Sequence, residues 1–195
     1  MSEHWQTVPL GSVVRFYSGT GFPERFQGFM NGDIPFFKVS DMSREGNEVY
    51  LQAANNYVSG DLVRREGWRL VPAGSIAFAK VGAALLLNRR RKLAFDCLVD
   101  NNMMAVEPQA GASTDWIYWQ LQRVDFGCIV QDGALPSINQ GQVAAIGIPQ
   151  ADTAEQLLVS SLLNDLDTTI RQTEALIEKL KQLKQGLQHN LLTRG

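Results

Sequence analysis

The last forty residues carry the pattern that most constrains the fold. Side chains that are almost all apolar recur at alternating intervals of three and four residues. The row is Leu163, Leu166, Ile170, Thr173, Ile177 and Leu180, continued by Leu183, Leu187 and Leu191. This alternation is the a/d seam of a coiled coil, although Lys184 stands where a strict heptad has an apolar residue. We therefore predict one long helix that pairs through these residues.

The boundaries of that helix are also encoded locally. Asp152 followed by Glu155 is typical of an N-cap with a carboxylate three residues later, and Pro149 keeps the incoming chain extended. No glycine or proline interrupts the run before Gly186. Such a helix would be roughly 55–60 Å long, too long to bury its apolar stripe on a small domain. It needs a partner helix.

The first 150 residues predict a β-rich domain. We expect strands within residues 5–17, 34–39, 48–51, 75–81, 103–106 and 143–149, a basic-tipped hairpin over 85–99, and a helix over 115–126. Trp116, Tyr118 and Trp119 fit a core better than a stacking platform. The predicted fold class is α+β, with a mixed β-rich domain over 1–150 and a spacer and dimerisation helix over 151–195.

Composition places this chain among soluble globular proteins. It is 45% hydrophobic and 19% charged, and two cysteines make no disulfide framework. No apolar run approaches the ~20 residues of a membrane span, and residues 1–20 lack the order of a signal peptide. We expect a cytoplasmic protein without membrane contact.

Charge is distributed unevenly along the chain. The net charge is only −2, yet residues 61–92 hold eight cations against two anions. This segment is therefore +6 and the remainder of the chain is −8. If the fold gathers these cations, they form one basic face of the kind that binds nucleic acid.

Residues suited to catalysis are scarce. The histidines, His4 and His189, lie near the two ends, so no Ser-His-Asp or Cys-His arrangement is indicated. Cys97 and Cys128 lack metal-ligand spacing, and the glycines around Thr20 lack the third glycine of a nucleotide-binding turn. We expect no catalytic residue, no metal and no cofactor.

Several short motifs resemble the specificity subunits of type I restriction-modification enzymes. In the tail these are I148-P149, E155-Q156, L166-D167 with I170, and L183-K184 leading to L191-L192-T193. In the front half they are L10-G11, G19-x-G21-x-P23, G32-D33-I34-P35-F36, S40-D41 and P72-A73-G74-S75-I76. Family members commonly carry two recognition domains and two helices in one chain. Since this chain has one of each, it resembles half a subunit or a separate piece of one.

The resemblance implies a function. Each target-recognition domain would read one part of a split site in double-stranded DNA, and paired antiparallel helices would set the spacing in a homodimer. A methyltransferase (M) subunit would supply methylation and a restriction/motor (R) subunit would supply cleavage. The resemblance does not supply the DNA sequence that is recognised.

The predicted DNA contacts come from the basic segment. They are Arg64, Arg65, Lys80, Asn88, Arg89, Arg90, Arg91 and Lys92. Cations would set register on phosphates, and only some arginines or Asn88 would reach base edges. Each could instead be a solvated surface charge. A second class also stays open, namely a structural coiled-coil protein with a β-rich head and no DNA role.

Overall fold

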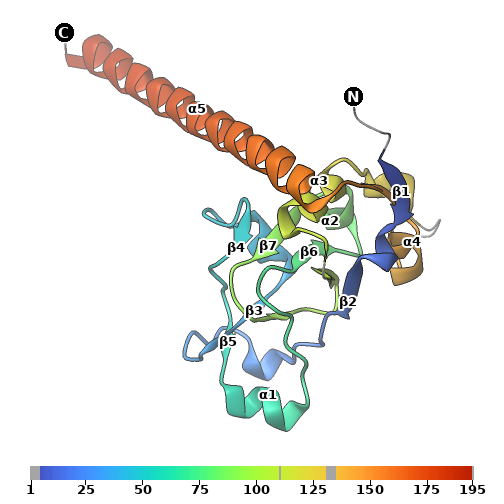
Figure 1. Cartoon of the computed structure of the whole chain (residues 1–195). Helices are drawn as coiled ribbons and strands as arrows, with labels where there is room; N and C mark the ends of the chain where they lie inside the picture. The colour runs from blue at the N-terminus through green and yellow to red at the C-terminus, as the bar shows by residue number, and fades with distance from the viewer. Residues whose placement is uncertain (1–4, 110, 131–134, 195) are drawn as a thin grey trace.

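The computed structural model describes residues 5–109, 111–130 and 135–194. Its long helix, α5 (Thr153–Arg194), projects from one side of a domain that the preceding residues build (Figure 1). With 42 residues it is about 63 Å long. The predicted N-cap is confirmed, because the Glu155 amide donates to the Asp152 carboxylate at 2.8 Å. None of the helices described is long and apolar enough to cross a membrane.

The central sheet has five strands in the order β2-β9-β6-β7-β4. Neighbouring strands run antiparallel except β4 and β7. β6 lies in the middle and all four of its residues are buried, since both faces of the sheet are covered. The strands are β2 (Val14–Ser18), β4 (Tyr50–Leu51), β6 (Ile76–Ala79), β7 (Arg90–Leu93) and β9 (Met103–Pro108).

Two smaller sheets complete the domain. β1 (Gln6–Pro9) pairs antiparallel with β10 (Gly147–Gln150), which brings the N-terminal segment beside the start of α5. β3 (Ile34–Phe37) lies between β5 (Tyr57–Val58), antiparallel, and β8 (Leu98–Val99), parallel. Pro35 is thus the second residue of a central strand, consistent with a proline near a strand beginning.

Short helices connect the strands. They are α1 (Gly60–Glu66), α2 (Ala83–Leu86), α3 (Thr114–Gln122) and α4 (Gln140–Ala144), with 3-10 turns η1 (Leu10–Ser12), η2 (Glu24–Phe26), η3 (Val39–Ser43) and η4 (Phe126–Cys128). α3 packs on one face of the central sheet, and Trp116 and Tyr118 are core residues as predicted. α1 lies at the end of the domain remote from α5 (Figure 1).

Two sequence predictions about local structure are wrong. The expected hairpin over 85–99 is absent, because α2 occupies its first arm and Arg90–Leu93 is a strand inside the central sheet. The strand expected over 143–149 begins only at Gly147. A capping box between Asn139 and Gln142 starts a helical turn before it, with both hydrogen bonds at 2.9 Å.

The faces of the central sheet carry different cores. Alternate residues of β6, Ile76 and Phe78, point toward α3, while Ala77 lies in a second cluster with Phe37. This period of two assigns every strand residue to one face or the other. Cations on β7 follow the same rule, which decides their role.

Candidate nucleic-acid interface and helix-pairing face

Arg90 lies in the interior of the domain. Its side chain is 1% exposed, and its guanidinium lies 3.8 Å from the centre of the Phe126 ring. One nitrogen donates to the Asn88 carbonyl at 2.6 Å and another donates to the Val124 carbonyl. Burial lowers the pKa of Arg90 to about 10. The prediction that Arg90 contacts DNA is therefore wrong for this fold, because the group is enclosed by its own domain.

Lys92 needs the same correction. It is 3% exposed, and its Nζ lies 2.6 Å from the Asp115 carboxylate of α3. Burial alone would lower the pKa of Lys92, but hydrogen bonds to Asp115 and Tyr50 outweigh it and raise the pKa. Lys92 and Arg90 are two residues apart on β7, so both point to the α3 face. There they hold α3 and η4 on the sheet.

Asn88 and Arg91 are also committed to internal contacts. Asn88 adopts a left-handed conformation (φ 53°), donates to the Asp125 carboxylate at 2.7 Å and accepts from the Phe126 amide at 2.8 Å. Arg91 is half-buried, donates to the Met42 carbonyl at 3.1 Å, and has its pKa lowered by burial. Neither side chain is free to read a base edge in this arrangement.

Arg64 and Arg65 are exposed on α1 but have nearby carboxylates. Arg64 bonds to Asp61, and Arg65 lies 3.6 Å from Glu66. Such exposed pairs are weak, so a phosphate could replace the carboxylate. α1 lies at the end of the domain away from α5 (Figure 1). A DNA contact by these arginines stays a prediction.

Strand pairing gathers several loops at one end of the central sheet. Ala79, the last residue of β6, lies opposite Met103, the first residue of β9. Phe78 lies opposite Arg90, the first residue of β7. β2 ends against the same part of β9, and β3 ends beside the end of β8. We call this region, with residues 18–21, 38, 80–89 and 100–102, the loop end of the sheet.

Three cations lie at the loop end. Lys80 and Arg89 belong to the predicted set, whereas sequence reasoning missed Lys38. Lys38 donates to Gln27 at 2.9 Å and Arg89 donates to the Ser43 hydroxyl. Within the part of the chain that the structure describes, none of the three forms an ion pair. Lys38 directly follows the apolar strand 34–37, and that position was the available signal.

One carboxylate approaches these lysines from inside. Asp100 is 6% exposed and accepts the Asn102 amide at 2.7 Å. Burial raises the pKa of Asp100, although Lys38 and Lys80 act in the opposite direction. The carboxylate lies beneath the surface, so the two lysines present their charge outward. The loop end therefore gathers three cations that form no ion pair among the residues described, a surface suited to phosphates.

The side of the domain under α5 has the opposite character. A groove of about 550 Å³ separates α5 from the segment that leads into β4. Three carboxylates line it, those of Glu48, Glu174 and Glu178, against the single cation of Arg171. Such a surface repels phosphates.

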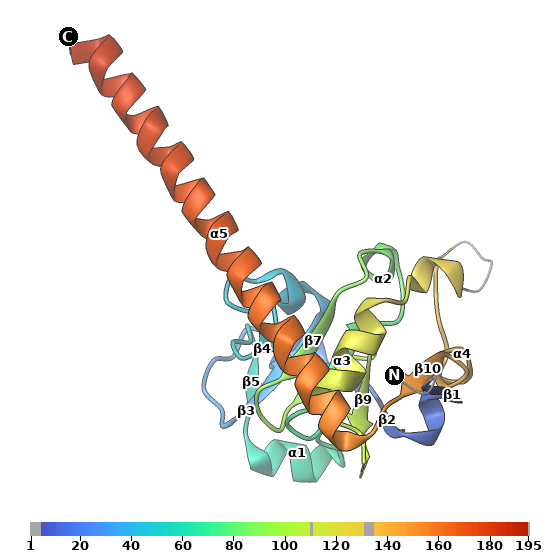
Figure 2. The ribbon, with the colours of Figure 1, turned by 45° about the horizontal axis from the view of Figure 1, so that its top comes forward.

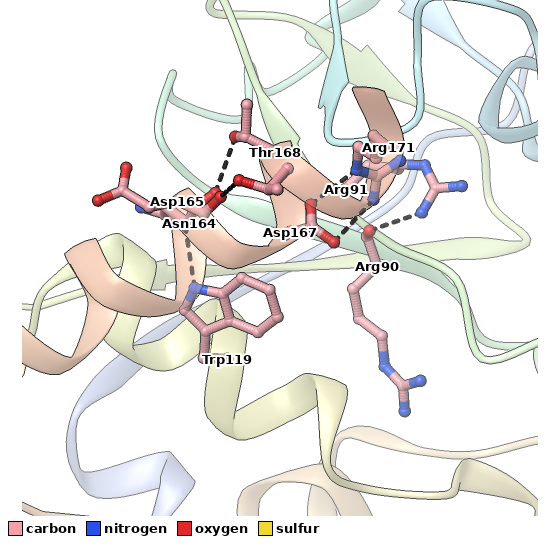
Figure 3. A network of polar contacts seen from close by, with 9 residues as sticks. Arg90, Arg91, Trp119, Asn164, Asp165, Asp167, Thr168 and Arg171 are labelled. Carbon is pink, nitrogen blue, oxygen red and sulfur yellow. Dashed lines mark hydrogen bonds and ion pairs between the residues drawn. The ribbon is translucent and has the colours of Figure 1, made fainter. Parts of the chain in front are cut away.

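The first turns of α5 are attached to the domain by hydrogen bonds. Gln156 accepts the Ser113 amide at 2.9 Å and donates to the Gly111 carbonyl at 3.1 Å. Asn164 accepts the Trp119 indole N–H at 2.9 Å (Figure 3) and donates to the Asp115 carboxylate at 3.0 Å. Because Asp115 also holds Lys92, polar contacts run from β7 through α3 to α5.

The inner face of α5 is thus a polar stripe. Its members are Gln156, Ser160, Asn164, Asp167 and Arg171, spaced by three or four residues. Gln156 and Ser160 are each 2% exposed, and Arg171 pairs with Asp167 at 2.7 Å (Figure 3). Sequence reasoning missed this stripe, although its spacing is as regular as that of the leucines.

The predicted seam lies on another face of α5 and is open to solvent. Exposed fractions are 60% for Leu166, 56% for Ile170, 47% for Ile177, 54% for Leu180, 54% for Leu183 and 61% for Leu187. Thr173 is exposed as well, and only Leu163 is half-buried. The helix does not fold back over its domain (Figures 1 and 2). None of the residues that the structure describes covers its apolar side.

Titratable groups elsewhere in the described part of the chain form no metal site. Among the residues described, no three histidine, cysteine or carboxylate side chains gather as metal ligands would. Cys97 is buried and its burial raises the pKa of the thiol, as for an unreactive core cysteine.

Comparison with solved structures shows the same fold in larger proteins. One match is a chain of a solved structure described as "Structural basis underlying complex assembly and conformational transition of the type I R-M system". It matches with a TM-score of 0.74 at 15% identity, over 97% of this chain and 46% of that one. The HsdS subunit from Thermoanaerobacter tengcongensis matches with a TM-score of 0.64 at 14% identity, over 88% and 39%.

A third match is the type I restriction-modification S subunit from M. genitalium, with a TM-score of 0.60 at 13% identity, over 96% of this chain and 45% of that one. This chain therefore spans less than half the length of each of the three proteins. The model of one protein family matches residues 2–182, almost the whole sequence. The chain belongs to the family of type I restriction modification DNA specificity domains.

Proposed function

We propose that this chain is a non-catalytic specificity subunit that reads one part of a split DNA target. Two copies pair through α5 and hold their domains at a fixed separation. The domain reads DNA, and α5 sets the spacing. The observation that carries this proposal is the open seam, a 42-residue helix whose leucines face away from its own domain within a family of DNA specificity domains.

The loop end is the proposed DNA surface. Lys38, Lys80 and Arg89 lie there without ion-pair partners among the residues described. The acidic groove beside α5 makes that side of the domain unfavourable for DNA phosphates. Phosphate contacts from these cations would fix register, and neighbouring amides such as the exposed Asn101 would reach bases.

Charge along α5 favours antiparallel pairing. Residues 152–178 carry six carboxylates and one arginine, whereas residues 179–194 carry four cations and no carboxylate. An antiparallel partner places its basic half beside the acidic half of the first helix, and a parallel partner would place like charges together. Electrostatic complementarity thus selects the two-fold arrangement.

A flanking row of leucines supports a further helical partner. Leu162, Leu176 and Leu183 lie on one heptad row beside the seam and are 54–57% exposed. Leu183, seven residues after Leu176, therefore fits this row better than the seam. A two-helix seam needs only the a and d rows, whereas a bundle also uses a flanking row. We assign this row to helices of a methyltransferase subunit, which brings the motor-nuclease subunit into the complex.

The length of α5 matches a split target. About 63 Å covers between one and a half and two turns of duplex at ~34–36 Å per turn. A two-fold dimer of identical domains would therefore read an inverted repeat with an unread gap.

Selection from a random duplex pool tests the proposal. The full chain, co-expressed with a type I methyltransferase subunit, is used to enrich bound DNA. We expect two half-sites in inverted orientation, separated by a gap of constant length. No enrichment, or one continuous asymmetric site, would contradict it. Absence of DNA binding would instead favour the structural coiled-coil role, which the family match does not favour.

A further inference from the structure

The connection between β6 and β7 presents two adjacent leucines to solvent. Leu86 is 47% exposed and Leu87 is 56% exposed. Along the chain Lys80 precedes them and Arg89 follows, and both cations belong to the loop end. α2, which carries Leu86, projects from the domain (Figure 2).

This tip is held firmly by the domain. Leu85 is 1% exposed and anchors α2 in the core. At the start of the connection, the Gly82 amide donates to the Pro136 carbonyl at 2.8 Å. At its end, Asn88 is fixed by Asp125 and by the Phe126 amide at 2.8 Å. Two leucines are thus presented on a backbone that is already ordered.

Exposure of one leucine needs no explanation, because much protein surface is apolar. Here two neighbours share a preorganised tip that two cations, Lys80 and Arg89, flank along the chain. The Asp125 carboxylate beside the tip accepts hydrogen bonds from Asn88 and from the Gly127 amide. The combination of apolar tip and flanking cations suits a polyanion whose interior is apolar, which describes duplex DNA. Phosphates would meet Lys80 and Arg89, and the stacked bases between the strands would meet the leucines.

We propose that Leu86 and Leu87 form a wedge that enters the groove of bound DNA, inserts at a base step and kinks the duplex. The inference rests on the DNA-binding role proposed above. Apolar wedges partly unstack a step, and the bent duplex then touches more protein. Because pyrimidine–purine steps kink most easily, the wedge contributes to sequence preference without a hydrogen bond to a base.

The experiment compares DNA shape with and without the leucines. The probe is a duplex enriched by the wild-type complex, labelled at its two ends for energy transfer. We expect wild-type protein to shorten the end-to-end distance. Leu86→Ala/Leu87→Ala should restore the distance of free DNA and weaken binding about tenfold. Leu86→Met/Leu87→Met, which keeps the apolar bulk, should retain both the kink and the affinity.

Phe95→Ala is the matched control, because Phe95 is 52% exposed but lies beyond the other end of β7. It should leave DNA shape and affinity unchanged. If wild-type protein binds the enriched duplex without bending it, or if the alanine pair bends it fully, the wedge is wrong and the DNA-binding role stands. If the alanine pair loses the methyltransferase subunit but bends DNA normally, the tip is a protein contact and the inference fails.

Discussion

The two faces of α5 are the reverse of an ordinary surface helix. Such a helix buries its apolar stripe against its own domain and exposes polar residues. Here Gln156, Ser160 and Asn164 face the domain, while Leu166 and Ile170 face solvent. Directional hydrogen bonds fix the angle at which the helix leaves the domain, and the apolar surface stays available for association. The comparison shows a helix that is fixed to its own domain by polar contacts and that leaves its apolar face exposed.

Polar substitution of the outer face should have the largest effect. Leu166→Gln/Ile170→Gln/Ile177→Gln should weaken self-association at least 100-fold, because each buried apolar side chain contributes about 1.5–3 kcal/mol. Light scattering on the purified chain measures this. The matched control is Gln172→Ala/Gln182→Ala, which changes two exposed polar residues of the same helix. A dimer that survives the triple change would place the pairing face elsewhere.

Loss of the Lys92–Asp115 ion pair, which supports the polar attachment of α5, should have the next largest effect. Lys92→Met leaves the Asp115 carboxylate without its cation and should lower the free energy of unfolding by about 2 kcal/mol, a moderate value because Asp115 is 35% exposed. Since the folded pKa of Lys92 lies above its usual 10.5, the wild-type advantage should persist through neutral pH and disappear only as pH rises through the folded value. Denaturant unfolding measures both.

Adding Asp115→Asn to Lys92→Met should recover part of this loss, because the uncompensated charge is then removed. A Lys92→Met variant with the same free energy of unfolding as the wild type would show that the Lys92–Asp115 pair does not hold α3 and α5 to the sheet. A loss of unfolding free energy that grows toward high pH would show the same.

Sequence periodicity predicts one of these two faces and not the other. The seam is visible because the 3,4 spacing of leucines is a local pattern. The inner stripe has equal spacing, but polar residues with that spacing are usually solvated. Only the tertiary position of α3, with Trp119 and Asp115 beside Asn164, gives the stripe its role.

In the basic segment, too, tertiary position decides the role of each residue. Eight cations within residues 61–92 predict a basic face only if they share a surface. Treating residues 88–92 as a hairpin tip exposes all of them, whereas β7 turns Arg90 and Lys92 inward. In a strand, neighbouring charged residues point to opposite faces of the sheet. A count of charge along the sequence does not show which face each residue occupies.

Substitution at the loop end should have an intermediate effect, and only on DNA. Lys80→Ala/Arg89→Ala should weaken DNA binding about tenfold and reduce the slope of log affinity against log salt by about 2, because each phosphate contact contributes ~0.9. Titrations at several salt concentrations measure the slope. Arg64→Ala/Arg65→Ala is the comparison, and we expect a smaller change. An equal or larger loss there would move the DNA surface to α1.

Removal of one hydrogen bond from the inner face should have the smallest effect. Trp119→Phe keeps the ring but removes the N–H that donates to Asn164 at 2.9 Å. We expect a loss of about 1 kcal/mol in unfolding free energy and no change in self-association. Thermal unfolding together with light scattering checks both, and weaker association would show that the two faces of α5 are coupled.

The distance between two copies tests the central claim most directly. Gln188 is exposed near the end of α5, and Cys128→Ser removes the exposed native thiol before Gln188→Cys is spin-labelled. If the predicted seam pairs antiparallel about its middle, near residue 175, the two labels lie about 40 Å apart, at ~1.5 Å per residue. Pulsed electron resonance on the full chain should give that long distance. A distance under about 20 Å, as parallel helices would give, or no dipolar signal at all, would contradict the account.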